Sequence, residues 1–199
     1  MKIMIIGDGG TFGSFLKAEL SALSGVVMTT NTVEADYIIL SVPSSAFDDA
    51  ARHIRGKHLV NVCSVQDAAT KTCLKYSTRV TGIHPMFGPN SPRSGRTCIV
   101  TYASEGSDEI INLFSRFCGE IVTEANGKVI SGKMHDEMMR KTHLPVLMFG
   151  ELAALIVEQA ADVPDNCLPT SFKRLKALAD QMKDMSPGTV ESIRSNRGH

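Results

Sequence analysis

The sequence lacks an excess of charge of either sign, and it lacks any long apolar run. Its 199 residues contain 21 basic and 21 acidic side chains, so the formal net charge is zero. Nucleic-acid-binding proteins usually carry a basic excess or stripe, and none is present here. No apolar run reaches the length that crosses a membrane. These absences argue against nucleic-acid and membrane partners, while a hydrophobic content of 43% is enough for a compact core.

Signals for export, disulfides and metal binding are also missing. The N-terminal stretch MKIMIIGDGG holds an apolar run of about five residues, which is too short for the core of a signal peptide. The five cysteines are odd in number and form no C-x-x-C pair, and the six histidines form no H-E-x-x-H pattern. We therefore expect a cytoplasmic protein with buried free thiols and no metal site.

Short apolar segments alternate with segments of helical periodicity over roughly the first 125 residues. The predicted strands cover residues 2–7, 26–30, 36–43, 58–63, 79–84, 97–103 and 120–124. The predicted helices cover residues 11–23, 44–54, 65–76 and 107–118, the last with Ser107 as its cap. The alternation predicts a doubly wound, mostly parallel α/β sheet.

After about residue 125 the alternation stops, and everything from Lys128 onward reads as helix and loop. We therefore predict an α/β domain over residues 1–125 and a short all-helical region over residues 126–199. Segment 144–160 is apolar on almost every side, and a helix of that kind must be buried. So few residues follow it that one chain can hardly cover it, and we expect a symmetric homodimer that buries this helix. Burial against the α/β domain of the same chain is the alternative.

A glycine-rich stretch, GDGGTFG, joins the first predicted strand to the first predicted helix. In a doubly wound sheet such a turn cradles a dinucleotide pyrophosphate, because glycines let the backbone approach the phosphates and the helix N-terminus supplies amides. The spacing is G-x-x-G-x-x-G instead of the usual G-x-G-x-x-G. Its position predicts a Rossmann-like dinucleotide-binding domain, with glycine needed for packing alone as the alternative. The residues predicted to bind the cofactor here are Gly7, Asp8, Gly9, Gly10, Thr11, Phe12 and Gly13.

The end of the second predicted strand bears on the choice of dinucleotide. An acidic residue there binds the ribose 2′-hydroxyl of NAD, and a nearby arginine accommodates the 2′-phosphate of NADP. The stretch TTNT has neither, so the sequence leaves NAD and NADP as alternatives. We expect Thr30 and Asn31 to contact the cofactor at this strand.

One histidine stands where the backbone has little freedom. His84 ends the predicted strand RVTGIH and precedes Pro85. A residue before proline is pushed into an extended conformation, so His84 should stay extended at the carboxyl end of its strand. That edge of an open α/β sheet faces the ligand crevice. Because the ordinary pKa of an imidazole is about 6.5, His84 suits the role of a proton acceptor near neutrality. A histidine that only hydrogen-bonds within a loop is the alternative.

The stretch GIHPMFGP resembles the histidine-proline-methionine motif of prephenate dehydrogenases, and its FGP ending is similar to the branch fused to chorismate mutase. Further matching pieces follow the same order along the chain: GDGGTFG at the first turn, LSVP at 40–43, VCSVQ at 62–66, HDEMM at 135–139 and THLP at 142–145. The resemblance covers most of residues 1–150. It implies that Ser41, Val42 and Pro43 also contact the cofactor.

The resemblance implies oxidative decarboxylation of prephenate to 4-hydroxyphenylpyruvate, in tyrosine biosynthesis, with hydride transfer to NAD or NADP. Hydride leaves ring carbon 4 while the hydroxyl on that carbon loses its proton, and loss of the ring carboxylate makes the ring aromatic. By resemblance, His84 accepts that proton or hydrogen-bonds the hydroxyl, Ser64 orients the hydroxyl or His84, and His143 lies in the substrate pocket. The resemblance also implies that the helical region makes the dimer.

Two positions depart from the family pattern. Gln66 stands where the family has a lysine after Ser-Val. The family binds a substrate carboxylate with an arginine from a later helix, and Arg174 is the only arginine in segment 170–184, with Lys176 as a second candidate. We therefore expect Arg174 to bind the substrate.

Two other functions stay open. The reduced helical region and the departure at the arginine favour a non-catalytic relative that binds a dinucleotide and acts as a sensor or scaffold. An NAD(P)-dependent dehydrogenase that acts on arogenate or another small acid is the third possibility. Because function lies in the site, the fold alone does not separate them.

His135, Met139 and His143 share one helical face, which suits a core or interface stripe as well as a binding surface.

Overall fold

The computed structural model describes residues 1–183, 185 and 187–196. The chain divides into two compact units, Met1–Asp136 and Glu137–His199. Within the described residues, no helix is both long enough and apolar enough to cross a membrane.

A seven-stranded sheet forms the centre of the first unit. Its strands lie in the order β2-β1-β3-β4-β5-β6-β7, and only the β5–β6 pair is antiparallel. The strands are β1 (Lys2–Ile6), β2 (Val27–Met28), β3 (Tyr37–Leu40), β4 (His58–Asn61), β5 (Val80–Pro85), β6 (Thr97–Ala103) and β7 (Glu120–Val122). This confirms the predicted doubly wound, mostly parallel sheet. The chain winds to opposite sides of β1 when it forms β2 and β3, which creates the switch point where such sheets bind ligands.

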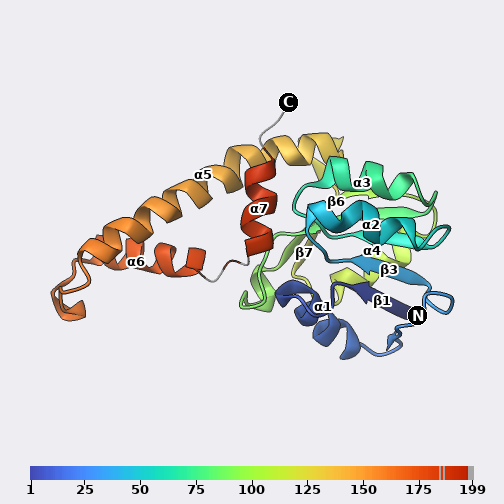
Figure 1. The fold of residues 1–199 in the computed structure, drawn as a ribbon, viewed down its shortest axis with the longest axis horizontal. Coiled ribbons are helices and arrows are strands. Elements are labelled where there is room, and N and C mark those ends of the chain that lie inside the picture. Colours follow the sequence, from blue (N-terminus) through green and yellow to red (C-terminus); the bar gives the residue numbers. More distant parts are fainter. Residues whose placement is uncertain (184, 186, 197–199) are drawn as a thin grey trace. The chain divides into compact units, whose positions relative to one another are not determined.

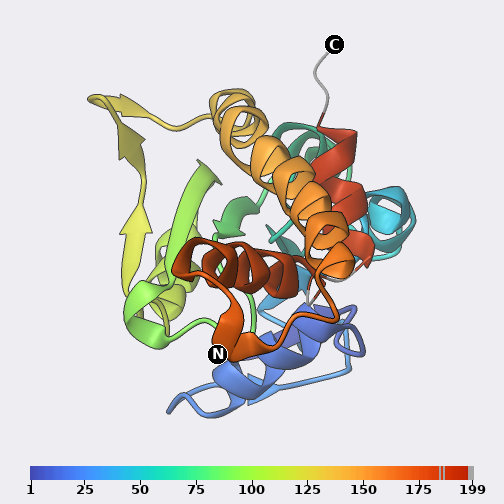
Figure 2. The ribbon, with the colours of Figure 1, turned by 90° about the vertical axis from the view of Figure 1, so that its left-hand side faces the viewer.

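Two pairs of helices cover the two faces of the sheet (Figure 1, Figure 2). Helices α1 (Thr11–Ser21) and α4 (Ser107–Ser115) share one buried cluster with the sheet, which includes Leu16, Leu20 and Phe114. Helices α2 (Phe47–Arg52) and α3 (Gln66–Leu74) form a second cluster on the other face. Short 3₁₀ turns precede α2 (Ser44–Ala46) and β6 (Arg93–Gly95).

Two local predictions differ from the structure. Ser107 does not cap α4: Gly106, in the left-handed region at φ 81°, is the N-cap. The Ser107 hydroxyl instead lies 2.7 Å from Thr81 Oγ1 and accepts the Ser104 amide at 2.9 Å. After β7 the chain forms a small hairpin, β8 (Glu124–Ala125) and β9 (Lys128–Val129). The predicted strand 120–124 is therefore divided between β7 and β8, and β9 lies where only helix and loop were expected. Asn126 and Gly127 both have positive φ there, which is the turn chemistry of a two-residue hairpin.

The second unit is helical. It contains most of α5 (Gly132–Gln159), a 3₁₀ turn (Asp165–Cys167), α6 (Thr170–Lys183) and α7 (Pro187–Ser195). Helix α6 lies so close to α5 that a Cβ at Gly150 would be 2.1 Å from Met182 Cγ. Arg194 of α7 pairs with Glu151 of α5.

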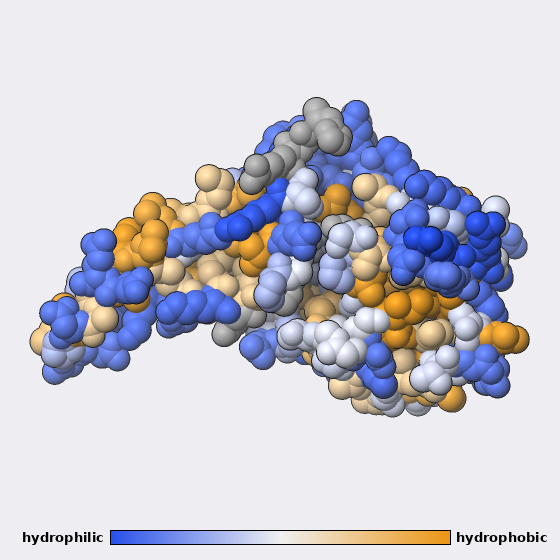
Figure 3. All heavy atoms as spheres, in the orientation of Figure 1, coloured by the Kyte–Doolittle hydropathy of each residue, from blue (hydrophilic) through white to orange (hydrophobic). Residues whose placement is uncertain are grey.

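Helix α5 leaves much of its apolar surface exposed in the single chain. Segment 144–160 was expected to be covered by pairing with a second copy, and burial in a dimer stays a prediction. Figure 3 shows hydrophobic residues at the surface of this unit, among hydrophilic ones. The exposed large apolar side chains of α5 are Val146, Met148, Phe149, Leu152, Leu155 and Ile156, which range from 40% to 62% exposed.

The expectation about thiols is correct for four of the five cysteines, which are free and buried: Cys63, Cys73, Cys98 and Cys118. Cys167 is also free but is exposed in the 3₁₀ turn of the second unit. Its position in a turn, instead of a strand or helix of the core, explains the difference.

Candidate active site

The glycine-rich turn after β1 is shaped by two glycines that tolerate no side chain. Gly7 has φ 94°, and a Cβ there would lie 2.2 Å from the Ser41 carbonyl oxygen. A Cβ at Gly13 would lie 2.0 Å from the Gly7 carbonyl oxygen. Gly7 therefore lets the turn pass against β3, and Gly13 lets α1 begin against the turn. Packing thus explains these two glycines, as the alternative interpretation of the motif required.

The other glycines of the turn face open space. A Cβ at Gly9 would meet no atom within 4 Å, and one at Gly10 would only touch the Gly7 carbonyl oxygen at 3.4 Å. Gly10 is the N-cap of α1, and the first turn of that helix contains no acidic side chain. Asp8 pairs with Lys17 at 2.7 Å, and the hydrogen bond and charge of Lys17 lower the pKa of Asp8 below its usual range. The turn thus presents an open helix N-terminus that suits an anion.

The structure brings the three predicted cofactor segments to one edge of the sheet. Strands β2, β1 and β3 are adjacent and parallel, so the segments that follow them meet at their carboxyl ends. These segments contain Gly7, Asp8, Gly9, Gly10, Thr11, Phe12 and Gly13 after β1, Thr30 and Asn31 after β2, and Ser41, Val42 and Pro43 after β3. Thr30 and Asn31 are exposed, and the Asn31 side-chain oxygen accepts the Val33 amide at 3.0 Å.

An aromatic cluster ties the loop after β5 to helix α1. Phe87, three residues after His84, lies with its ring centroid 6.2 Å from those of both Phe12 and Phe15. The buried Arg96 guanidinium stacks over Phe15 at 4.8 Å and Phe87 at 5.6 Å, and it pairs with Glu19 of α1 at 2.8 Å. The HPMFGP loop is therefore anchored to the helix that begins at the glycine-rich turn.

His84 lies near the carboxyl end of β5, as the sequence predicts. Strand β5 pairs with parallel β4 as far as Gly82, where a bulge shifts its register with β6. The residues after Gly82 thus extend past the last paired residue of β4. Bulges of this kind often re-aim a side chain beside a functional site. The His84 side chain is buried, with 4% of the residue exposed.

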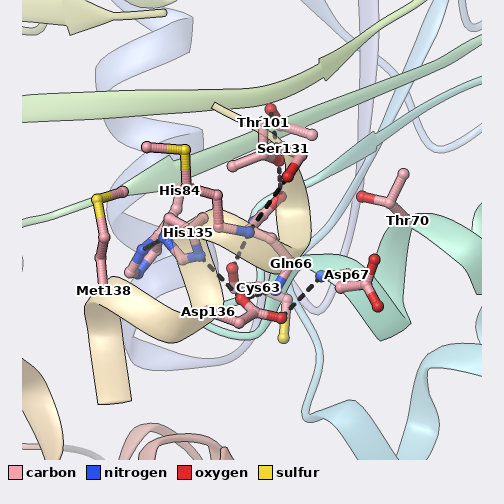
Figure 4. A network of polar contacts seen from close by, with 12 residues as sticks. Cys63, Gln66, Asp67, Thr70, His84, Thr101, Ser131, His135, Asp136 and Met138 are labelled. Atoms are coloured by element: carbon pink, nitrogen blue, oxygen red, sulfur yellow. Dashed lines mark hydrogen bonds and ion pairs between the residues drawn. The ribbon is translucent and has the colours of Figure 1, made fainter. Parts of the chain in front are cut away.

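Three buried polar side chains form a line that ends at His84 (Figure 4). His84 Nδ1 lies 2.8 Å from His135 Nε2, and His135 Nδ1 lies 2.8 Å from Asp136 Oδ1. The two rings are nearly perpendicular, at 83°. His135 has no exposed surface and Asp136 has 9%.

Asp136 also binds the first turn of α3. Its Oδ1 accepts a hydrogen bond from the backbone N–H of Gln66 at 2.8 Å, and its Oδ2 accepts one from the backbone N–H of Asp67 at 2.9 Å. Gly132 permits this approach, because a Cβ there would lie 2.8 Å from Asp67 Cα. A carboxylate at a helix N-terminus is favoured by the unpaired amides and the helix dipole. Asp136 thereby fixes the start of α5 and the His135 ring against the sheet edge.

Gln66 sits in a neutral buried network. Its Nε2 donates to the Cys63 carbonyl at 2.5 Å, and its Oε1 accepts from Asn61 at 3.2 Å and Thr101 at 2.6 Å. Gly82 leaves room for the Gln66 side chain, because a Cβ at position 82 would lie only 2.8 Å from Gln66 Oε1. A lysine could donate here but could not accept, because an ammonium has no acceptor atom. The network accounts for glutamine at the position where the family pattern has lysine.

The remaining predicted site residues are spread over the two units. Ser64 is partly buried in the loop after β4, the strand next to β5. His143 is half-buried on α5, and Arg174 is exposed on α6, both in the second unit. Lys176, the second candidate for the substrate carboxylate, pairs with Asp165 at 2.8 Å. The described residues contain no group of three or more side chains placed to hold a metal ion.

Sequence reasoning gave no role to the pair His135–Asp136. The pattern HDEMM was one of the pieces that resemble the family, and it placed His135 on a helical face that suits a core stripe, but it gave neither residue a role. Its contact with His84 joins residues 51 positions apart in the chain, and no local periodicity encodes such a contact. The available signals were the resemblance of HDEMM to the family and two adjacent ionisable residues near the start of a helix.

The chain is similar in sequence to a curated protein from Methanocaldococcus jannaschii, a "Probable arogenate/prephenate dehydrogenase". The two are 26% identical over 161 residues, which cover 71% of this chain and 35% of that protein. The chain therefore spans about a third of the length of this relative. No family model matches the chain.

Solved structures show the same fold. Prephenate dehydrogenase from A. aeolicus, in complex with hydroxyphenyl propionate and NAD+, has a TM-score of 0.61 at 17% identity, covering 99% of this chain and 83% of that one. Synechocystis arogenate dehydrogenase also has a TM-score of 0.61, at 16% identity, covering 98% of this chain and 85% of that one. The chain is thus similar in sequence to a probable arogenate/prephenate dehydrogenase, and it has the Rossmann-like fold of prephenate and arogenate dehydrogenases.

Proposed function

We propose that this chain is an NAD(P)-dependent prephenate dehydrogenase, which converts prephenate to 4-hydroxyphenylpyruvate by oxidative decarboxylation. The observation that carries the proposal is His84, a buried histidine held by a hydrogen bond near the carboxyl end of β5. Its loop is anchored to the helix that follows the glycine-rich turn. The similarity to a probable arogenate/prephenate dehydrogenase supports the choice of substrate class.

The residues of the turn fit a dinucleotide. Gly9 and Gly10 leave open space in front of the α1 N-terminus, and no acidic side chain in its first turn repels a phosphate. Thr30, Asn31, Ser41, Val42 and Pro43 occupy the adjoining strand ends. When bound, the nicotinamide supplies the acceptor for the hydride. Because no carboxylate or arginine stands at the end of β2, both NAD and NADP remain candidates.

The reaction needs a proton acceptor beside the hydroxyl on ring carbon 4. In the proposal His84 accepts that proton as hydride leaves the same carbon, and Ser64 orients the hydroxyl. Loss of the ring carboxylate as carbon dioxide then makes the ring aromatic, and the phenol oxygen recovers a proton. The reaction thus releases no net proton. A positioned general base of this kind contributes a factor of about 10²–10⁴ in rate.

The second unit carries the remaining proposed contacts. We assign His143 to the substrate pocket and Arg174 to a substrate carboxylate, as the resemblance implies. The exposed apolar side chains of α5, for example Phe149 and Leu152, support a homodimer through this unit. A second copy of the helix would cover a surface that the described residues leave in water.

An initial-rate assay tests the proposal. The full chain is supplied with prephenate or arogenate, each with NAD or NADP, and absorbance of the reduced nicotinamide is followed. The proposal expects turnover with prephenate and at least one dinucleotide. Turnover with arogenate alone would assign the enzyme to the related substrate. Tight dinucleotide binding without turnover on either acid would favour a sensor or scaffold.

A further inference from the structure

The line of contacts behind His84 determines which ring nitrogen carries a proton. Asp136 accepts two backbone amides of α3, one on each carboxylate oxygen. An ionised carboxylate only accepts hydrogen bonds. The contact between this carboxylate and His135 Nδ1 at 2.8 Å is therefore an N–H donated by His135.

The same reasoning passes along the next contact. A neutral imidazole donates from one nitrogen and accepts at the other. If His135 donates from Nδ1, its Nε2 accepts, and the partner at 2.8 Å is His84 Nδ1. His84 must then carry its hydrogen on Nδ1, which leaves the lone pair on Nε2.

We propose that His135 and Asp136 are positioning residues that hold His84 in the Nδ1–H tautomer, so that Nε2 is the atom that accepts the proton. The role of that proton in catalysis rests on the proposed function, whereas the tautomer does not. When His84 becomes positively charged, the His135 ring and the Asp136 carboxylate stabilise it through oriented hydrogen bonds. The carboxylate of the serine-protease triad orients its histidine in the same manner.

Other ionisable groups lie around this line. Asp67, in the first turn of α3, pairs with Lys71 at 2.7 Å, and Cys63 lies in the loop after β4. The Asp67 carboxylate is thus compensated by its own partner. Asp136 is the carboxylate that contacts the histidine pair directly.

The tautomer can be measured without substrate. Nitrogen NMR of the wild-type full chain, with the His84 signals assigned by comparison with His84→Asn, distinguishes a protonated from an unprotonated ring nitrogen. We expect protonated Nδ1 and unprotonated Nε2 near neutral pH. A wild-type His84 that carries its hydrogen on Nε2 would overturn the proposal, whatever the variants do.

Two substitutions of similar size test the cause. In His135→Gln the amide NH₂ can donate to Asp136 and the amide oxygen can accept from His84 Nδ1, so the tautomer should be kept. His135→Leu removes the acceptor. We expect the leucine variant to lose about 10²–10³-fold in kcat with unchanged cofactor affinity, most of the contribution of a general base. The glutamine variant should stay within about tenfold of wild type.

The control is His53→Leu, at an exposed position on another helix end, which should change neither tautomer nor kcat. Wild-type tautomer and turnover in His135→Leu would refute the positioning role. An Nδ1–H His84 in a protein that oxidises neither prephenate nor arogenate would refute the proposed function but leave the positioning role intact. The two hypotheses therefore fail separately.

Discussion

The first unit, Met1–Asp136, has a buried apolar core on each face of its sheet, whereas the longest helix of Glu137–His199 exposes much of its apolar surface. The first unit has two buried clusters, one on each face of the sheet, and a buried polar line at the sheet edge. In the second unit six large apolar side chains of α5 are at least 40% exposed. The contrast is one of burial: the first unit packs its core within itself, and the exposed face of α5 is the surface that the proposed dimer would cover.

This difference separates two kinds of requirement. The groups proposed to move the proton and hold the cofactor are fixed by packing within the first unit. Small substitutions there should therefore change turnover, cofactor affinity or stability. In the second unit, substitutions of exposed side chains should change the oligomeric state. The predictions that follow test each side of this contrast, in order of expected size.

The largest effect is expected at His84. Asparagine is smaller and still donates a hydrogen bond, but it accepts no proton near neutral pH. We expect His84→Asn to lower kcat by about 10²–10⁴-fold, while the affinity for NAD or NADP measured by calorimetry is retained. His53→Asn, at a side chain that is 73% exposed, is the matched control. Near-normal turnover in the His84 variant would place the proton acceptor elsewhere.

The glycine-rich turn should separate folding from binding. Gly10→Val leaves the backbone in an extended conformation that valine accepts, but it fills the space before the α1 N-terminus. We expect loss of detectable dinucleotide binding in a folded protein. Gly13→Ala should destabilise the fold itself, by about 1–3 kcal/mol or more, because its Cβ meets the Gly7 carbonyl. Gly9→Ala is the control for stability. Unchanged cofactor affinity in a folded Gly10→Val protein would contradict the assignment of the turn.

Stability should depend on pH through His58, a buried histidine on β4. Burial, and then the charge of Arg79, lower the pKa of His58 to about 4. The unfolded chain therefore binds the proton first, and stability falls as pH decreases from about 6.5 to about 4. At about 1.4 kcal/mol per pKa unit the loss is about 3 kcal/mol at most.

Urea unfolding of wild type and His58→Gln at a series of pH values measures the contribution of His58 to the loss of stability at acid pH. The glutamine can still bond to Thr81, which lies 2.8 Å from His58 Nε2, but it does not titrate. The gap between the two unfolding free energies should change through this pH window in favour of the variant. Parallel curves for the two proteins would show that His58 contributes no acid sensitivity.

Substitutions on the exposed face of α5 should affect the first unit least. Their expected effect is on the oligomeric state of the second unit. Leu152→Glu should shift sedimentation from dimer to monomer, since it places a charge in the proposed interface. Val33→Glu, at an apolar side chain of the first unit that is 81% exposed, should leave assembly unchanged. A wild-type monomer at micromolar concentration would contradict the dimer.

Local patterns in the sequence predicted most strands and helices of the first unit. The strand Thr97–Ala103 matches the prediction residue for residue, and His84 lies at the predicted strand end. The hairpin at 124–129 was missed although Asn126–Gly127 is a strong turn signal, because its strands are only two residues long. The assignment of Ser107 as a cap was wrong because Gly106 can adopt positive φ and the serine hydroxyl finds buried partners instead.

The polar line behind His84 was beyond local patterns. It depends on the docking of the first turn of α5 on the N-terminus of α3, which needs Gly132 for close approach and Asp136 to accept two amides. Such contacts join distant parts of the chain, and their residue types also occur in ordinary buried networks. The roles of Ser64, His143 and Arg174 stay predictions.

Product stoichiometry tests the central claim most directly. The full chain is incubated with prephenate and the dinucleotide that it binds, and reduced cofactor, carbon dioxide and 4-hydroxyphenylpyruvate are quantified together. The proposed reaction predicts that the three products form in equal amounts, and that their formation is lost in His84→Asn. Reduced cofactor without carbon dioxide, or no product from prephenate at any concentration, would contradict it.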